Sequence, residues 1–464
     1  MSFIKTYKLP ALTALICCLL YGSFAYDLYR SDFIKLISLF GALFCLTYLL
    51  IRQYGWNFKL LAGIGILFRL IFLLATPNLS QDFYRFLWDG HWMMEGINPY
   101  LFTPQSYMDS PAMQLKLPFE NASQLYEGMG ALNGSHYTNY PPVNQLFFAM
   151  ATLLGGKSML GSVIGLRISI ILADIGILYF GKKVLSTLQL PVKNIFWYFL
   201  NPFIIIELTG NLHFEGVMLF FFVFSLYFLQ RGKWFVSAVF LGISIATKLI
   251  PLLFLPLFFQ WFWKKKKSFF IGLKNVSLYY LIVLSTVFIT FLPFLSSAFF
   301  TNYVETTALW FQNFEFNASV YYIIRWVGYQ VVGWNIIESA GKVLPFLVIA
   351  FILIVTFFRN NSNLKQLITA MLLSMSFYLF LATTVHPWYV ATPLLLGVFT
   401  NYKFPILWSI LVMLSYNAYK IEGVEENLWV VFGEYVLIIG VVLWEIFFKK
   451  KITPQTSILD IQNT

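Results

Sequence analysis

Long apolar stretches separated by short polar ones run through almost the whole chain. Because about 20 apolar residues cross the hydrocarbon core of a bilayer as a helix, such stretches predict membrane-spanning helices. The pattern therefore predicts an all-α, polytopic transmembrane helical bundle of about 13–14 spans. We expect these spans at residues 11–28, 33–51, 58–76, 163–181, 193–209, 214–230, 234–249, 250–262, 276–297, 341–358, 364–382, 386–400, 403–420 and 428–448.

Two regions depart from this simple pattern. The stretches 234–249 and 250–262 are short and are divided near Lys248, which predicts either two tight spans or one broken re-entrant unit. The segment 143–155 is too short to cross comfortably, and a crossing there would move the lysines at 182–193 to the outer side. We therefore expect an interfacial or partly embedded helix at 143–155.

Composition and charge agree with a membrane protein. The chain is 59% hydrophobic and 11% charged, whereas a soluble domain carries about 25% charged residues. The net charge is +11, and the excess stands in short clusters beside apolar runs, such as Lys182-Lys183, Lys264–Lys267 and Lys449–Lys451. Such clusters mark cytoplasmic loops and place the N-terminus inside. Without a basic face and interleaved stacking residues, nucleic acid is not an expected partner.

This orientation places two long loops, 77–142 and 298–340, on the non-cytoplasmic side, the first of them the larger. The acidic residues and histidines gather in these loops or at outer helix ends, as a reaction chamber would require. Polar residues also belong in loops for ordinary reasons of solvation, which explains part of the pattern. The residues concerned are Asp82, Asp89, His91, Glu95, His136, His213, Glu215 and His386.

The first outer loop carries two aspartates at helical spacing. Asp82 and Asp89 are seven residues apart, so a helix would place them on one face, two turns apart, with Arg85 between them. An Asp at the outer end of a span can take a proton from an acceptor hydroxyl as a general base. A helix cap at Asp82 and a solvated face at Asp89 would give the same pattern, and both interpretations stay open.

Polar side chains also interrupt apolar surroundings further along the chain. A short hairpin between two apolar runs carries His213 and Glu215, which can bind sugar hydroxyls or cap two helix ends. Lys248 lies where a broken helix can present a cation to a phosphate, although a lone lysine can also snorkel. Arg325 in the second outer loop is an alternative to Lys248 as the cation that contacts the phosphate. His386 can donate to the phosphate or to a sugar hydroxyl, or cap a helix.

Three charged residues, Arg69, Arg167 and Asp174, lie inside apolar runs. Arg167 and Asp174 are seven residues apart and share a helix face. A structural ion pair between helices is favoured here over a catalytic role.

The order of the motifs resembles a known family. The string Asp82-Phe-Tyr-Arg-Phe-Leu-Trp-Asp-Gly is followed by Gly96-Ile-Asn-Pro-Tyr, Tyr140-Pro-Pro, Asn201-Pro, Gly210-Asn-Leu-His-Phe-Glu, Lys248-Leu-Ile-Pro and His386-Pro-Trp-Tyr. The order and spacing of these motifs, over about residues 58–400, resemble those of the polyprenol-phosphate-mannose-dependent mannosyltransferases of the GT-C class. A similar order occurs in the mannosyltransferase of GPI-anchor assembly. The resemblance implies a GT-C-like catalytic domain at 58–448, an additional N-terminal hairpin at 1–57 and a cytoplasmic tail at 449–464.

The resemblance also implies an activity. It implies an integral membrane glycosyltransferase that moves a sugar, mannose in that family, from a polyprenyl-phosphate donor to a lipid or glycan acceptor at the non-cytoplasmic face. A single displacement predicts inversion. The family's loop-one Asp is the proposed catalytic base, which by match is Asp82. The residues then expected to bind the donor phosphate or sugar are Arg85, Asp89, His213, Glu215, Lys248, Arg325 and His386.

One departure from the family concerns metal binding. Relatives often carry two acidic residues at the start of the loop-one motif, and here the first of these positions is Gln81. A divalent metal, Mg²⁺ or Mn²⁺, is left with Asp82 and Asp89 as ligands, and Arg or Lys can neutralise a phosphate instead. The motif wording favours a bacterial inner membrane. The alternative function is a transporter or flippase of lipid-linked sugars, because broken helices also suit transporters.

Overall fold

The computed structural model describes residues 2–116, 121–263 and 268–448, and these residues are almost entirely helical. The predicted lysine clusters at 264–267 and 449–451, and the predicted tail, lie outside the described residues. Each apolar run predicted as a span contains helix, so the all-α polytopic class is confirmed. A single short antiparallel ribbon, β1 (Tyr419–Lys420) with β2 (Gly423–Val424), is the sheet structure of the described part.

Seven helices of the described part are long and apolar enough to cross a membrane, and a bent helix pair brings the number to eight if it counts as one span. The pair comprises α11 (Pro202–Ile204) continued by the π-helix η2 (Ile205–Gly210), and α12 (Glu215–Gln230). The chain is thus an integral membrane protein with fewer full-length spans than apolar runs. The long helices are α1 (Ser2–Tyr26), α2 (Phe33–Tyr54), α9 (Met159–Thr187), α15 (Phe269–Phe291) continued by η4 (Leu292–Phe294), α18 (Ile337–Phe358), α19 (Leu364–Leu381), and α22 (Leu428–Leu443) continued by η7 (Trp444–Phe448).

The remaining apolar runs form shorter helical pieces. Prolines and one extended residue interrupt them: Lys248 has φ −146° and ψ 139°, so no helix passes through it. The division predicted near Lys248 is therefore confirmed. The pieces are α3 (Phe58–Ile71), η1 (Val192–Ile195), α10 (Phe196–Phe199), α11 (Pro202–Ile204), α13 (Trp234–Thr247), η3 (Ile250–Phe258), α14 (Phe259–Trp263), η5 (Pro387–Val390), α20 (Ala391–Val398), α21 (Phe404–Leu411) and η6 (Val412–Ala418).

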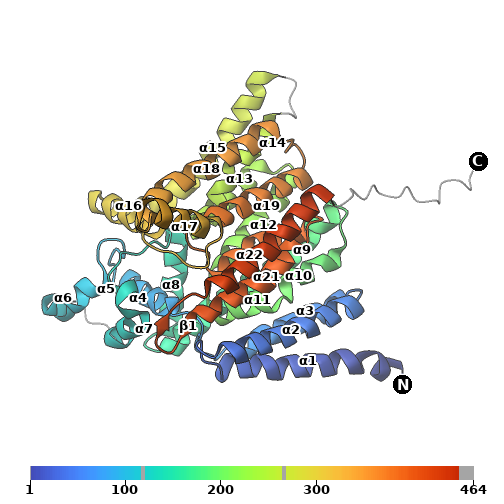
Figure 1. Ribbon diagram of the computed structural model, residues 1–464, viewed down its shortest axis with the longest axis horizontal. Helices are drawn as coiled ribbons and strands as arrows, with labels where there is room; N and C mark the ends of the chain where they lie inside the picture. Colours follow the sequence, from blue (N-terminus) through green and yellow to red (C-terminus); the bar gives the residue numbers. More distant parts are fainter. Residues whose placement is uncertain (1, 117–120, 264–267, 449–464) are drawn as a thin grey trace, which may run out of the picture.

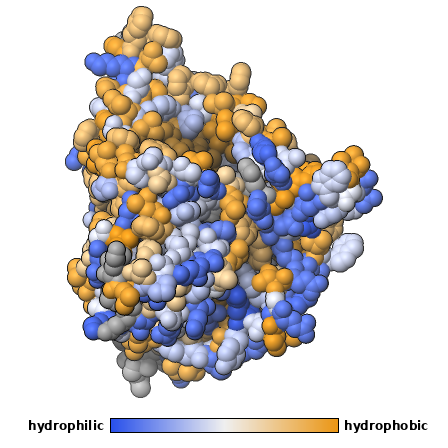
Figure 2. Space-filling view, turned by 90° about the vertical axis from the view of Figure 1, so that its left-hand side faces the viewer, coloured by the Kyte–Doolittle hydropathy of each residue, from blue (hydrophilic) through white to orange (hydrophobic). Residues whose placement is uncertain are grey.

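The two long loops are themselves helical and gather at one end of the molecule (Figure 1). The marked N-terminus lies towards the opposite end, so α1 brings its last residues to the loop end. Seen from that end, hydrophilic residues collect over part of the surface and hydrophobic ones border them (Figure 2). The loop helices are α4 (Asp82–Met94), α5 (Pro104–Met108), α6 (Pro111–Lys116), α7 (Ala122–Gly134), α16 (Ser297–Gln312) and α17 (Val320–Val332), and α8 (Pro142–Gly155) follows the first loop.

Helix α4, which begins with Asp82, is fixed by close packing on α8. Phe86 stacks on Phe148 with ring centroids 4.6 Å apart. A Cβ on Gly90 would stand 2.6 Å from the carbonyl oxygen of Phe148, so only glycine allows this approach. The close packing of α4 on α8 thus accounts for the glycine at the end of the first-loop motif, Gly90. Helix α8 has 14 residues, as short as predicted, and its interfacial position stays a prediction.

The buried charges inside the bundle form structural contacts. Arg69 of α3 donates from Nε to Asp174 Oδ2 of α9 at 2.8 Å, and both side chains are fully buried. Arg167 donates to the backbone carbonyls of Thr209 and Gly210, each at 2.9 Å. The expected inter-helix pair therefore exists, with Arg69 as the partner of Asp174, while Arg167 holds the bend between η2 and α12.

Removing one member of this pair should destabilise the fold. We expect Arg69→Met to cost about 3–5 kcal/mol, because it leaves the Asp174 carboxylate buried without a counter-charge. Thermal unfolding in detergent measures this loss. The double variant Arg69→Met/Asp174→Leu should recover most of it, because it removes both charges together. Equal losses in the two variants would contradict the assignment of a structural pair.

Candidate active site

The base candidate, Asp82, opens helix α4 at the loop end of the molecule. Its backbone N–H donates to Ser80 Oγ at 3.3 Å, and its side chain is half-buried. The segment before it is anchored, because the Leu79 N–H donates to Asn211 Oδ1 at 3.0 Å. Asn211 also donates to the Ile206 carbonyl at 3.1 Å. Both polar ends of Asn211 are thus used within the protein, and this side chain positions the start of α4.

The bent pair of helices places the hairpin residues. η2 and α12 meet at 113°, and Leu212 in the turn between them has φ +63°. The turn directs His213 and Glu215 into the interior, where His213 is 1% exposed and Glu215 is fully buried. Glu215 is the first residue of α12, a position where the helix dipole favours a carboxylate.

Lys248 and Glu215 meet from opposite sides of this interior. Their Nζ and Oε1 atoms are 2.5 Å apart. Lys248 is freed for this contact by the break between α13 and η3. Its Nζ also lies 6.0 Å from the centre of the Tyr140 ring, and Tyr140, Lys248 and Glu215 all influence the Asp82 carboxyl. The structure therefore joins Glu215 and Lys248 and places Asp82 within the field of both charges.

One wall of the site is a stack of flat rings. His213 stacks on Trp388 with centroids 3.6 Å apart, and Trp388 stacks on His386 at 4.5 Å. Phe316 of the second outer loop covers His386 at 5.3 Å. Backbone bonds hold this cover, because Phe316 donates to the Thr383 carbonyl at 3.1 Å and accepts from the Val385 N–H at 2.8 Å. Both predicted histidines thus belong to a single wall.

Several buried polar atoms of this interior make no hydrogen bond to the described part of the protein. Glu207 accepts from Tyr416 Oη at 2.8 Å through one oxygen, and its other oxygen lies 3.9 Å from His213 Nε2. Within the described part of the chain, Glu207 Oε2, His213 Nε2, Glu215 Oε2 and His386 Nδ1 are buried without a hydrogen-bond partner. Buried polar atoms are nearly always satisfied, so such a cluster is suited to a polyhydroxyl ligand.

The surroundings tune the acid–base groups at the loop end. Burial raises the pKa of Asp82 to about 6, the Glu215 charge adds to this rise, and the charges of Lys248 and Arg30 and the Tyr140 hydrogen bond oppose it. At neutral pH the Asp82 carboxylate is thus ionised.

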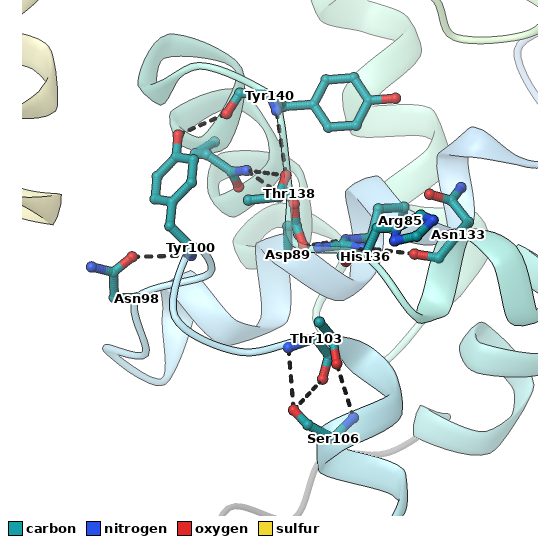
Figure 3. Close-up of polar contacts among 11 residues, drawn as sticks. Arg85, Asp89, Asn98, Tyr100, Thr103, Ser106, Asn133, His136, Thr138 and Tyr140 are labelled. Atoms are coloured by element: carbon teal, nitrogen blue, oxygen red, sulfur yellow. Dashed lines mark hydrogen bonds and ion pairs between the residues drawn. The ribbon is translucent and has the colours of Figure 1, made fainter. Parts of the chain in front are cut away.

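Arg85 and Asp89 are engaged with other groups of the protein (Figure 3). Arg85 Nε donates to Asp89 Oδ1 at 2.8 Å, and Gln145 donates to Asp89 Oδ2 at 2.9 Å. Arg85 also holds the carbonyls of Asn133 and His136. This geometry favours a structural role for both residues. With both Asp89 oxygens in use two helical turns from Asp82, the residues present do not fit a metal ion bridging Asp82 and Asp89.

Arg325 is also engaged outside the cluster. It forms an ion pair with Glu315 and lies over the Tyr322 ring, 4.3 Å from its centre. Tyr321 donates to the same glutamate at 2.8 Å. Arg325 therefore stabilises the second outer loop, and the structure does not place it beside Lys248.

Three residues that sequence reasoning did not select border the site. Tyr416 donates a hydrogen bond to Glu207, and the Tyr419 ring packs against the Phe316 ring with centroids 5.8 Å apart. Arg30, in the loop between α1 and α2, lies over the Tyr419 ring at 4.0 Å. The charge pattern carried a signal for Arg30, since a cation on the predicted outer side goes against the rule that positive charges stay inside.

Fold and site together define a multi-span membrane protein with an acid–base centre at one end of its helices. A sequence model described as "Alpha-(1->6)-mannopyranosyltransferase, N-terminal domain" matches residues 27–265. This match covers more than half of the chain, and the chain belongs to that family, the MptA_B family. The resemblance noted in the sequence motifs is thereby confirmed.

A curated relative supports the same assignment. The chain is 20% identical over 340 residues to alpha-(1->6)-mannopyranosyltransferase A of Mycobacterium tuberculosis (strain ATCC 25618 / H37Rv). The match covers 69% of this chain and 61% of the relative, so the chain spans less than two thirds of the relative's length.

Proposed function

We propose that this protein is a membrane mannosyltransferase that uses a polyprenyl-phosphate sugar donor, with Asp82 as the general base. The observation that carries the proposal is the Lys248–Glu215 ion pair at the edge of a buried polar interior, whose two charges act on the Asp82 carboxyl. A base for the acceptor and a cation for the leaving phosphate are the two groups that transfer from a lipid phosphate requires. Family membership supports mannose as the sugar.

The reaction is a single displacement. The acceptor hydroxyl gives its proton to the Asp82 carboxylate as its oxygen bonds to the anomeric carbon. The bond from that carbon to the phosphate oxygen breaks, and polyprenyl phosphate leaves with the electron pair. Lys248 stabilises the charge that grows on the leaving phosphate. Attack opposite the leaving group inverts the anomeric configuration.

The sugar occupies the buried interior in this proposal. His213 Nε2, Glu215 Oε2 and His386 Nδ1 supply hydrogen-bond partners for its hydroxyls. The lipid chain of the donor lies among the helices, and a lipid or glycan acceptor approaches from the loop end. The charge pattern of the sequence supports the non-cytoplasmic side for that end. The resemblance of the motifs favours a bacterial inner membrane.

Donor choice tests the proposal. Purified protein is given an oligosaccharide acceptor with labelled mannose carried either by polyprenyl phosphate or by a nucleotide. We expect transfer from the lipid phosphate alone, into a product whose new bond has the configuration opposite to that in the donor. Transfer from the nucleotide sugar alone, or retention of configuration, would overturn the proposal.

The pH dependence of transfer should follow Asp82. A general base acts only when deprotonated, so kcat/KM should rise with pH through about 6 and stay level above it. The groups that face this carboxyl are Lys248, Glu215, Tyr140 and Arg30. Initial rates measured between about pH 4.5 and 8.5 give this rise of kcat/KM with pH. A rate that is constant across pH 6 would contradict the assignment of the base.

A further inference from the structure

Arg30 stands out among the arginines near the loop end because its donors are largely unused. Its Nη1 donates to the Leu79 carbonyl at 3.2 Å, the single hydrogen bond that it makes within the described part of the chain, although a guanidinium has five N–H groups. Among the described residues, no ion pair joins it to a carboxylate. Arg69, Arg85 and Arg325, in contrast, are each paired with an acidic side chain.

The position of Arg30 is fixed between two walls of the site. Leu79 lies three residues before Asp82, and the Tyr419 ring supports the guanidinium from the other side at 4.0 Å. Tyr419 in turn packs near Phe316, the residue that covers His386. The loop that carries Arg30 is tied down as well, because Asn78 donates to the Phe24 and Leu28 carbonyls. Arg30 therefore presents free donors at the edge of the interior.

The charges of the site indicate that a bound phosphate requires a further cation. Lys248 is neutralised by Glu215 at 2.5 Å, and Asp82 adds a further negative charge. A phosphate entering with Lys248 alone would thus meet a net negative neighbourhood. The field of Arg30 already reaches Asp82. An arginine with free donors suits a phosphate, because its planar fork can give two parallel hydrogen bonds.

We infer that Arg30, supplied by the hairpin of α1 and α2, is the second cation that binds the lipid-linked phosphate beside Lys248. This inference deepens the proposed function and rests on it for the identity of the donor. It also gives the N-terminal hairpin a part in the site, whereas the sequence predicted an addition outside the catalytic domain. The family match, which begins at residue 27, includes Arg30.

The test compares Arg30→Met with Lys35→Met. Lys35 belongs to the same hairpin and pairs with Asp27 at 2.8 Å, so its variant also removes one cation. For the full-length protein in detergent, we expect Arg30→Met to raise the KM for the lipid-phosphate sugar by on the order of 10- to 100-fold. The Ki of polyprenyl phosphate as an inhibitor should rise by a similar factor. Arg30→Lys should fall between, and Lys35→Met should leave both constants within about twofold.

A binding assay separates the inference from the proposed function. It measures the affinity for polyprenyl phosphate by the displacement of a fluorescent analogue from the protein. If the wild type binds the lipid phosphate through Arg30 but transfers no sugar, the proposed function fails and the inference stands. If the wild type transfers sugar and Arg30→Met changes neither KM nor Ki, the inference fails alone. A loss of thermal stability and kcat with unchanged KM and Ki would also overturn it, since Arg30 would then be only a tie between loops.

Discussion

Asp82→Asn should lower kcat by about 10²–10⁴-fold, the usual contribution of a positioned general base. Asparagine keeps the size of the side chain and can still accept a hydrogen bond from Tyr140, but it cannot take the acceptor's proton. KM for the donor should change little, because Asp82 acts on the acceptor hydroxyl rather than on the phosphate. Initial rates at saturating donor measure the effect.

Asp109→Asn is the matched control for this variant. Asp109 lies in the same outer loop and is exposed, so its change removes one carboxylate without touching the interior. Its kcat should equal that of the wild type. Full turnover by a correctly folded Asp82→Asn protein would remove Asp82 from the mechanism.

Lys248→Met should reduce kcat/KM by about 10²–10³-fold, because the leaving phosphate loses its closest cation. The same change should shift the rise of the remaining activity to higher pH, since the Lys248 charge lowers the pKa of Asp82. Steady-state kinetics across the pH range detect both effects.

The single variant also leaves Glu215 buried without its partner, which can destabilise the protein by about 3–5 kcal/mol. The double variant Lys248→Met/Glu215→Gln removes both charges and should restore stability. We expect it to fold as the wild type does and to remain as inactive as Lys248→Met. Recovery of activity in the double variant would mean that the lysine serves the fold alone.

The apolar runs allowed the helices to be predicted, but not how many of them are long. Runs such as 193–209 are helical along most of their length, yet prolines and tight turns divide them into pieces. Hydropathy reports which residues avoid water, but it does not report where the chain bends or where a helix ends. The break at Lys248 was predictable because a charge and prolines coincide there.

The site could be predicted in part. The motif order predicted Asp82, Glu215 and Lys248 as site residues. The contact between Glu215 and Lys248, which are 33 residues apart, depends on folding. The ion pair of Arg85 with Asp89 could have been inferred from their separation of four residues, which favours such a pair on one helix. The ring stack of His213 on Trp388 joins distant segments and left no local signal in the sequence.

The most direct test of the account follows sugar and lipid in the same proteoliposomes. The donor is polyprenyl-phosphate mannose labelled in the sugar, and both incorporation into acceptor and movement of the lipid between leaflets are recorded for the wild type. The account predicts incorporation that depends on the protein and is lost with Asp82→Asn. Movement of the lipid-linked sugar between leaflets, without any transfer to acceptor, would contradict it and identify a transporter of the same ligand.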